Sequence, residues 1–189
     1  MLKVLNNFFL TLILLGNLSC APNTKAIVDT QANYPWDSCS YQIGDNACNF
    51  TLKDQDGKAI SLYDFYGKTI VLDFSTMWCG PCGLAASEVQ KVKEALSEED
   101  FVYITVIIED LGRSPPEVDN CRDWADYYGI EEPVLAGSRS LIDRNGEVGW
   151  PVTSWPTFFF ITKDMVIHST LKGFNSEYID RLILEAMSQ

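Results

Sequence analysis

Hydrophobic positions along the first half of the chain change between two periodicities. Residues 50–52 alternate as a short strand, and residues 69–75 form a β-branched, apolar run that is typical of a buried strand. After this run the period becomes 3.6, and apolar residues between 85 and 96 fall on one face of a predicted helix. Residues 101–108 are again continuously apolar, which predicts a second buried strand.

A second helix follows that strand. Ser114-Pro115-Pro116-Glu117 has the spacing of a capping box with proline at the first helical position, so we expect the helix to begin there. It should continue through Trp124 to about Tyr128, because Gly129 is a favourable residue for ending a helix.

The last part of the chain predicts one short strand, a hairpin and a final helix. Residues 133–136 are the short strand, 157–162 and 166–171 are the arms of the hairpin, and Ser176 is the predicted N-cap of the helix. The order strand, helix, strand, helix, hairpin, helix is typical of an α/β sandwich with a mixed central sheet.

The N-terminus has the pattern of an export signal. Lys3 precedes an apolar run, residues 8–15, that is too short to span a bilayer stably. Leu18-Ser19-Cys20 resembles a bacterial lipoprotein cleavage site, so Cys20 is a candidate for lipidation. The alternative is ordinary cleavage nearby, with Cys20 removed or left as a free thiol. We therefore predict a signal peptide of lipoprotein type over 1–19, a flexible tether over 20–38 and one domain over 39–189.

Composition narrows the class of partner. The chain of 189 residues has a formal net charge of −12, and no basic stripe that could displace counterions from nucleic acid. An acidic surface is most often a solubility feature, and a preference for basic partner proteins is the alternative. We expect protein substrates and no nucleic acid.

Six cysteines add a redox interpretation, because export places them where disulfides persist. Cys39 and Cys48 flank a short loop, for which we predict a structural disulfide. Cys121 is then a buried thiol or the partner of Cys39 or Cys48, since sequence alone does not fix connectivity. A C-x-x-C pair supplies half of a tetrahedral zinc site and His168 is the single histidine, so we expect no metal.

Cys79-Gly80-Pro81-Cys82 lies between a buried strand and an amphipathic helix. Unpaired N–H groups and the positive end of the helix dipole favour the thiolate of Cys79, which is the form that attacks a disulfide. Cys82, one turn inside the helix, is placed to resolve the mixed disulfide. Pro81 is tolerated because the first helical N–H groups have no internal partner, and Gly80 leaves room for a partner chain. A plain disulfide staple is the non-catalytic alternative.

These residues match a known family. Trp78-Cys79-Gly80-Pro81-Cys82 resembles the active-site motif of thioredoxins, and residues 48–187 are similar to the exported, membrane-tethered TlpA/ResA type of thiol-disulfide oxidoreductase. Asp73 stands where thioredoxins have a buried Asp, Trp155-Pro156-Thr157 where they have a cis-proline, and Gly173 where they have a glycine. The resemblance implies a thioredoxin-like three-layer sandwich with an N-terminal extension.

The resemblance also implies roles for these side chains. A buried carboxyl at Asp73 should have a raised pKa and could exchange the proton of Cys82 through water. Pro156 would shape the groove that binds the substrate and would expose backbone groups that pair with a substrate strand. Thr157 follows the proline, as the family pattern expects. Trp155 and Trp78 are candidate walls of the same groove.

We therefore predict a monomeric enzyme that needs no cofactor and reduces disulfides of exported proteins in the bacterial periplasm. A membrane thiol relay would return its cysteine pair to the reduced state. An oxidant or isomerase of the same fold is the alternative. A thiol peroxidase is less favoured, although Thr76 is placed as in peroxiredoxins, and a copper chaperone would need a different cysteine spacing.

Two features remain open in the sequence. Glu109 ends the second buried strand and could approach the site, but a solvated strand end is the more ordinary interpretation. The segment 110–151 is longer than a minimal thioredoxin needs, and the sequence assigns it no mechanism.

Overall fold

The structure, a computed structural model, describes residues 34–96 and 101–189. These residues form seven strands: β1 (Thr51–Lys53), β2 (Ala59–Ser61), β3 (Thr69–Ser75), β4 (Phe101–Ile107), β5 (Val134–Ala136), β6 (Thr157–Ile161) and β7 (Ile167–Lys172). They also form the helices α1 (Gly80–Ala95), α2 (Val118–Tyr128) and α3 (Ser176–Met187), and the short 3-10 turns η1 (Leu62–Phe65) and η2 (Arg139–Leu141).

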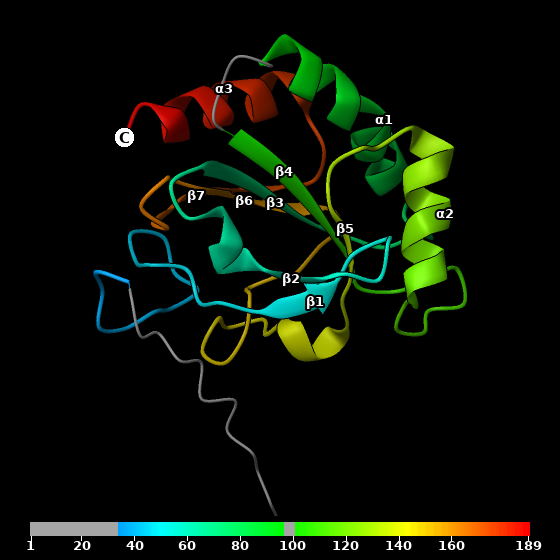
Figure 1. Cartoon of the computed structure of the whole chain (residues 1–189), viewed down its shortest axis with the longest axis horizontal. Helices are drawn as coiled ribbons and strands as arrows, with labels where there is room; N and C mark the ends of the chain where they lie inside the picture. Colours follow the sequence, from blue (N-terminus) through cyan, green and yellow to red (C-terminus); the bar gives the residue numbers. More distant parts are fainter. Residues whose placement is uncertain (1–33, 97–100) are drawn as a thin grey trace, which may run out of the picture. The chain divides into compact units, whose positions relative to one another are not determined.

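The strands make one mixed sheet in the order β2-β1-β5-β4-β3-β6-β7 (Figure 1). β3, β4 and β5 are parallel neighbours, while β6 is antiparallel to β3 and β7 is antiparallel to β6. The predicted α/β class with a mixed central sheet is confirmed, and so is its thioredoxin-like character, which the structural comparisons below establish.

Alternation along the central strands produces two cores. Val71 of β3 packs with the buried faces of α1, α2 and α3, whereas its neighbours Ile70 and Leu72 pack on the opposite face of the sheet. That second face is covered by η1 and by residues on either side of Trp150. Both faces of β3 and β4 are therefore buried, which explains why these strands are continuously apolar in the sequence.

Two predicted helix starts were wrong. α2 begins at Val118 with Glu117 as its N-cap residue, not at Ser114. The Ser114 amide instead donates to the Asp110 carboxylate in a turn, and the Asn120 side chain accepts from the Glu117 amide. In α3 the N-cap is Asn175, whose side chain accepts from the Tyr178 amide, so Ser176 is the first helical residue. In both cases a competing polar side chain captures the free amides.

Only part of the N-terminal segment, from residue 34 on, belongs to the described residues. The signal segment 1–19 and Cys20 lie outside the described residues. Tyr34 and Trp36 are stacked on each other, and both contact Tyr63 of η1, so the end of the predicted tether packs against the domain. Within 34–96 and 101–189, no helix has the length and apolar character needed to cross a bilayer.

The cysteines outside the C-x-x-C pair separate into two kinds. Cys39 and Cys48 are joined by a disulfide that closes the loop between them. Cys121 is a buried free thiol in α2, packed in the core beneath the helices. Burial raises the pKa of Cys121 to about 12, and the nearby Asp54 carboxylate contributes, so this thiol is unreactive at neutral pH.

Candidate active site

The C-x-x-C pair follows the carboxyl end of the central strand β3. The strand ends at Ser75, and Cys79 is the N-cap residue of α1, with Pro81 in the first turn. Cys79 and Cys82 are joined by a disulfide with their Cα atoms 5.2 Å apart. Gly80 and Pro81 between them are exposed, which leaves the pair open to a partner from that side.

The two sulfurs differ in environment. Cys79 is 8 % exposed and Cys82 is fully buried, so the first is the one that an incoming group can approach. The Cys82 amide donates to Cys79 Sγ at 3.2 Å. The same amide also donates to the Cys79 carbonyl at 3.0 Å. Its position in the first turn of α1 means that this amide and the helix dipole together would stabilise a thiolate at Cys79.

Asp73 lies two residues before the end of β3, on the same face as Val71, which is the face that α1 covers. Its carboxylate accepts from Ser75 Oγ at 2.7 Å and lies 3.5 Å from the Tyr103 hydroxyl of β4. Burial raises the pKa of Asp73 to about 7, although these two hydrogen bonds lower it. A carboxyl with this pKa can both take up and release a proton near neutral pH.

Pro156 reaches the same edge of the sheet from the opposite chain direction. β6 starts at Thr157 and is antiparallel to β3, with Thr157 opposite Phe74, so the residue before β6 lies where β3 ends. The Trp155–Pro156 peptide bond is cis. The Pro156 carbonyl accepts from the Gly173 amide at 2.8 Å, and Thr157 Oγ1 donates to the Ser154 carbonyl.

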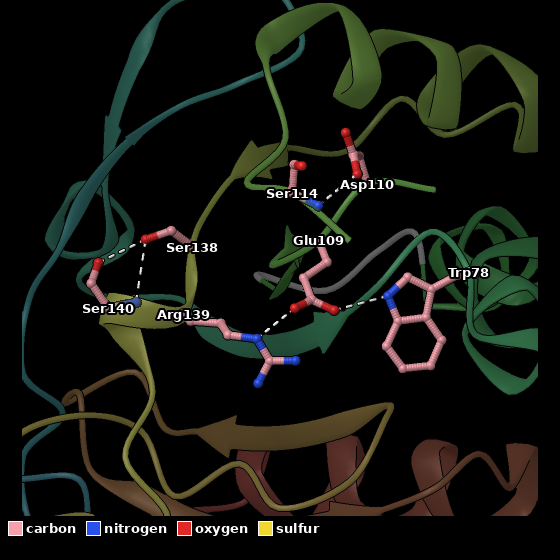
Figure 2. Close-up of polar contacts among 7 residues, drawn as sticks. All are labelled: Trp78, Glu109, Asp110, Ser114, Ser138, Arg139 and Ser140. Atoms are coloured by element: carbon pink, nitrogen blue, oxygen red, sulfur yellow. Dashed lines mark hydrogen bonds and ion pairs between the residues drawn. The ribbon is translucent and has the colours of Figure 1, made fainter. Parts of the chain in front are cut away.

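Glu109 is the site residue for which the sequence favoured the wrong environment. It is 5 % exposed rather than solvated, and its two carboxylate oxygens are used separately. Oε2 accepts from Trp78 Nε1 at 2.9 Å, while Oε1 pairs with Arg139 Nε (Figure 2). The hydrogen bond from Arg139 is the largest cause of the lowered pKa of Glu109, despite its burial, so this carboxyl stays ionised.

The tertiary arrangement explains how these residues meet. β3, β4 and β5 are parallel, so Trp78, Glu109 and Arg139, which each follow one of these strands, gather at one edge. Arg113 adds to the group by placing its guanidinium carbon 4.4 Å from the centre of the Trp78 ring. Sequence analysis missed Arg139, although its position shortly after a predicted strand was an available signal.

The site is therefore a disulfide at a helix N-terminus, above a buried carboxyl and beside a cis-proline. The profile of the AhpC/TSA family matches residues 43–170, and the thiol-disulfide oxidoreductase ResA of Bacillus thuringiensis is 31% identical over 70% of each chain. The chain belongs to the AhpC/TSA family. The resemblance to ResA-type proteins and the predicted enzyme class, a thiol-disulfide oxidoreductase, are confirmed by these relatives.

Solved structures agree with the fold of this AhpC/TSA family member. A thioredoxin-family thiol:disulfide interchange protein of Chlorobium tepidum superposes with a TM-score of 0.63 at 22% identity, covering 80% of this chain and 99% of that one. The exposed lipoprotein thioredoxin of Streptococcus pneumoniae gives a TM-score of 0.56 at 27% identity, over 73% and 99% of the two chains.

The described part of the chain does not meet the requirements of a metal-binding site. Residues 34–96 and 101–189 contain no group of three or more His, Cys, Asp or Glu side chains that could hold a metal ion. His168 lies on β7, half-buried, with its Nε2 atom 4.0 Å from Oε2 of Glu185 on α3.

Proposed function

We propose that this chain reduces disulfides in exported proteins, with Cys79 as the attacking thiolate and Cys82 as the resolving thiol. The observation that supports it best is the unequal exposure of two sulfurs at one helix N-terminus. Cys79, the more accessible residue of the two, receives the stabilising amide hydrogen bond, whereas Cys82 is fully buried and has no access to a large substrate. This asymmetry assigns the two steps of dithiol–disulfide exchange to different residues.

The chemistry begins with both cysteines reduced. The Cys79 thiolate attacks one sulfur of the substrate disulfide, which forms a mixed disulfide and releases the other substrate sulfur as a thiolate. Cys82, once deprotonated, attacks Cys79 Sγ, so the second substrate thiolate leaves and the Cys79–Cys82 disulfide forms. Two electrons pass from the protein to the substrate.

Asp73 supplies the base for the second step in this proposal. Its raised pKa, about 7, lets its carboxylate accept the Cys82 proton through a water molecule and return it in the reverse half-cycle. Within the described residues no hydrogen bond joins Asp73 to either cysteine, which is why a bridging water is part of the proposal.

The groove around the pair would hold the substrate chain. The backbone next to Pro156 would pair with an extended substrate segment, in a form of strand addition; the position of Pro156 just before β6, where β3 ends, supports this role. Trp155 and Trp78 would form its walls, with Gly80, Pro81 and Thr157 completing the surface. Such an enzyme, acting as a monomer, would need a membrane thiol relay to return it to the dithiol state, because the compartment outside the cytoplasm has no soluble pool of reductant.

Location follows from the N-terminus in the same proposal. The signal-like residues 1–19 would direct export to the bacterial periplasm, and lipidation of Cys20 would anchor the domain at the membrane through residues 20–38. The description of a pneumococcal relative as an exposed lipoprotein supports this anchor.

The reduction potential of the Cys79–Cys82 pair tests the direction of electron flow. The mature protein would be equilibrated with glutathione or dithiothreitol buffers, with Cys79→Ser as the blank. We expect a potential of about −250 mV or lower, near that of thioredoxin. A potential above about −180 mV would make the protein an oxidant or isomerase. A pair that does not exchange would contradict oxidoreductase chemistry at this site, and peroxide consumption would then test the thiol peroxidase alternative.

A further inference from the structure

A pocket of about 300 Å³ opens beside the cis-proline, and two arginines line it. Its walls are Arg139, Ile142, Arg144, Val152, Thr153 and Trp155. Trp155 immediately precedes Pro156, so the pocket continues the surface on which the proposed substrate segment would lie. Most of these residues belong to the segment 110–151 or follow it directly, and the redox steps described above do not use the two arginines.

Two arginines in one pocket are unusual for this protein. The chain has five arginines in all and a formal net charge of −12, so a positively charged pocket departs from the general character of the molecule. The acidic background would repel an acidic substrate, and a local pair of guanidinium groups is the feature that would accept a carboxylate at one defined place.

Arg139 is fixed by one hydrogen-bonded ion pair, and its other N–H donors remain available. Glu109 fixes its Nε atom, while Trp78 holds the other oxygen of that carboxylate, as Figure 2 shows. A guanidinium group has five N–H donors, so the terminal nitrogens of Arg139 remain for a further acceptor. The side chain is 63% exposed, which leaves these donors accessible from the pocket.

Arg144, the second arginine of the pocket, forms no ion pair with the residues that the structure describes. Its neighbour Asp143 does not pair with it, because the Asp143 carboxylate accepts the amides of Asn145, Glu147 and Val148 within the turn. The Glu109 carboxylate offsets the charge of Arg139, whereas the guanidinium group of Arg144 has no ion-pair partner among the described residues. Ile142, Val152 and Trp155 give the pocket an apolar wall beside the two guanidinium groups.

From this geometry we propose that Arg139 and Arg144 bind the carboxylate of an Asp or Glu side chain that lies a few residues from the target cysteine in the substrate polypeptide. Each residue of an extended chain spans about 3.3 Å, so a segment paired beside Pro156 brings side chains of nearby positions to the pocket. This assignment rests on the proposed reductase function. It specifies the substrates as polypeptides that carry an acidic side chain near the disulfide.

Single-turnover reduction of matched peptides tests the proposal. Disulfide-linked peptides, labelled so that reduction separates a fluorophore from its quencher, would carry one Glu at successive positions within about three residues of the cysteine. Each has a Gln counterpart. With the prereduced protein, we expect the second-order rate constant of the Glu peptide to exceed that of its Gln partner by about threefold to tenfold at one position, and less at high salt.

Arg144→Gln is the decisive variant, because it leaves the Trp78, Glu109 and Arg139 contacts in place. It should lower the Glu-to-Gln ratio markedly toward one, because only Arg139 is left to bind the carboxylate, without changing the rate for the Gln peptides. Arg181→Gln is the matched control: it removes an exposed arginine of α3 that pairs with Glu185 and does not line the pocket. The control should keep the wild-type ratio.

Three outcomes would overturn the proposal: a ratio of one at every position in the wild type, a ratio that survives Arg144→Gln, or an Arg144 effect confined to glutathione disulfide. The last would assign the pocket to the carboxylates of glutathione instead of a polypeptide. If all peptides react at equal rates and Cys79→Ser abolishes the reaction, the carboxylate site alone fails. If no peptide reacts, the reductase function itself fails.

Discussion

The hydroxyl of Tyr103 lies 3.5 Å from Oδ2 of Asp73, in a place where neither side chain reaches solvent. The two residues come from adjacent parallel strands and face the same core as the reactive helix. Because Tyr103 stabilises the anion of Asp73, it is a positioning residue for the group that would move the Cys82 proton.

Replacing Tyr103 by Phe should therefore raise the pKa of Asp73 further, since one hydrogen bond to its anion is lost. The pH at which the rate of the second exchange step reaches half of its maximum should move upward with it. Stopped-flow reduction of a disulfide peptide across pH 5 to 9 would measure this shift. An unchanged pH profile together with lowered stability would assign Tyr103 a packing role only.

Asp73 should make the protein less stable as the pH rises. In the unfolded chain this carboxyl ionises near its usual pKa of 3.8, whereas in the folded protein it keeps its proton until about pH 7. The folded state thus binds more protons between these values, so the free energy of unfolding falls across this interval, by up to about 4 kcal/mol from this group.

The measurement for Asp73 is urea denaturation of the oxidised protein at intervals from pH 4 to pH 8. Asp73→Asn removes the ionisable group, so the variant should show a flatter dependence and be more stable than the wild type above pH 7. Its second exchange step should be slower. Parallel curves for the two proteins would contradict the raised pKa.

Glu109→Ala should destabilise the fold by about 1–3 kcal/mol, because it removes the acceptor of Trp78 Nε1 and leaves Arg139 without its partner. Glu109→Gln should cost less, since an amide oxygen can still accept from the indole. Guanidinium denaturation would measure both. Glu88→Ala is the control, as it breaks an exposed pair with Lys91 and should change the stability by less than about 1 kcal/mol.

Replacing both Cys39 and Cys48 by Ala should lower the free energy of unfolding by about 2–3 kcal/mol, because the disulfide closes a loop with a sequence separation of 9. The reduction potential of the Cys79–Cys82 pair should stay unchanged. Thermal unfolding and the redox titration described above would check the two parts. A changed potential would show that this disulfide takes part in electron transfer.

The periodicity of the chain was sufficient to place most of the framework. The buried strands β3 and β4, the hairpin of β6 and β7, and the end of α2 at Gly129 follow from apolar runs and turn residues that act over a few positions. The starts of α2 and α3 did not follow, because several adjacent side chains compete for the same free amides and their energies differ by small amounts.

Sequence by itself determined the location of the reactive pair and of the cis-proline candidate, because both are carried by short motifs at defined places relative to strands. Only the tertiary structure decided the surroundings. Trp78, Glu109 and Arg139 are separated by about thirty residues each, and they meet because three parallel strands end at one edge of the sheet. Local patterns describe which residues can form a strand or helix, whereas contacts across a sheet depend on strand order, which only the packing of the whole domain fixes.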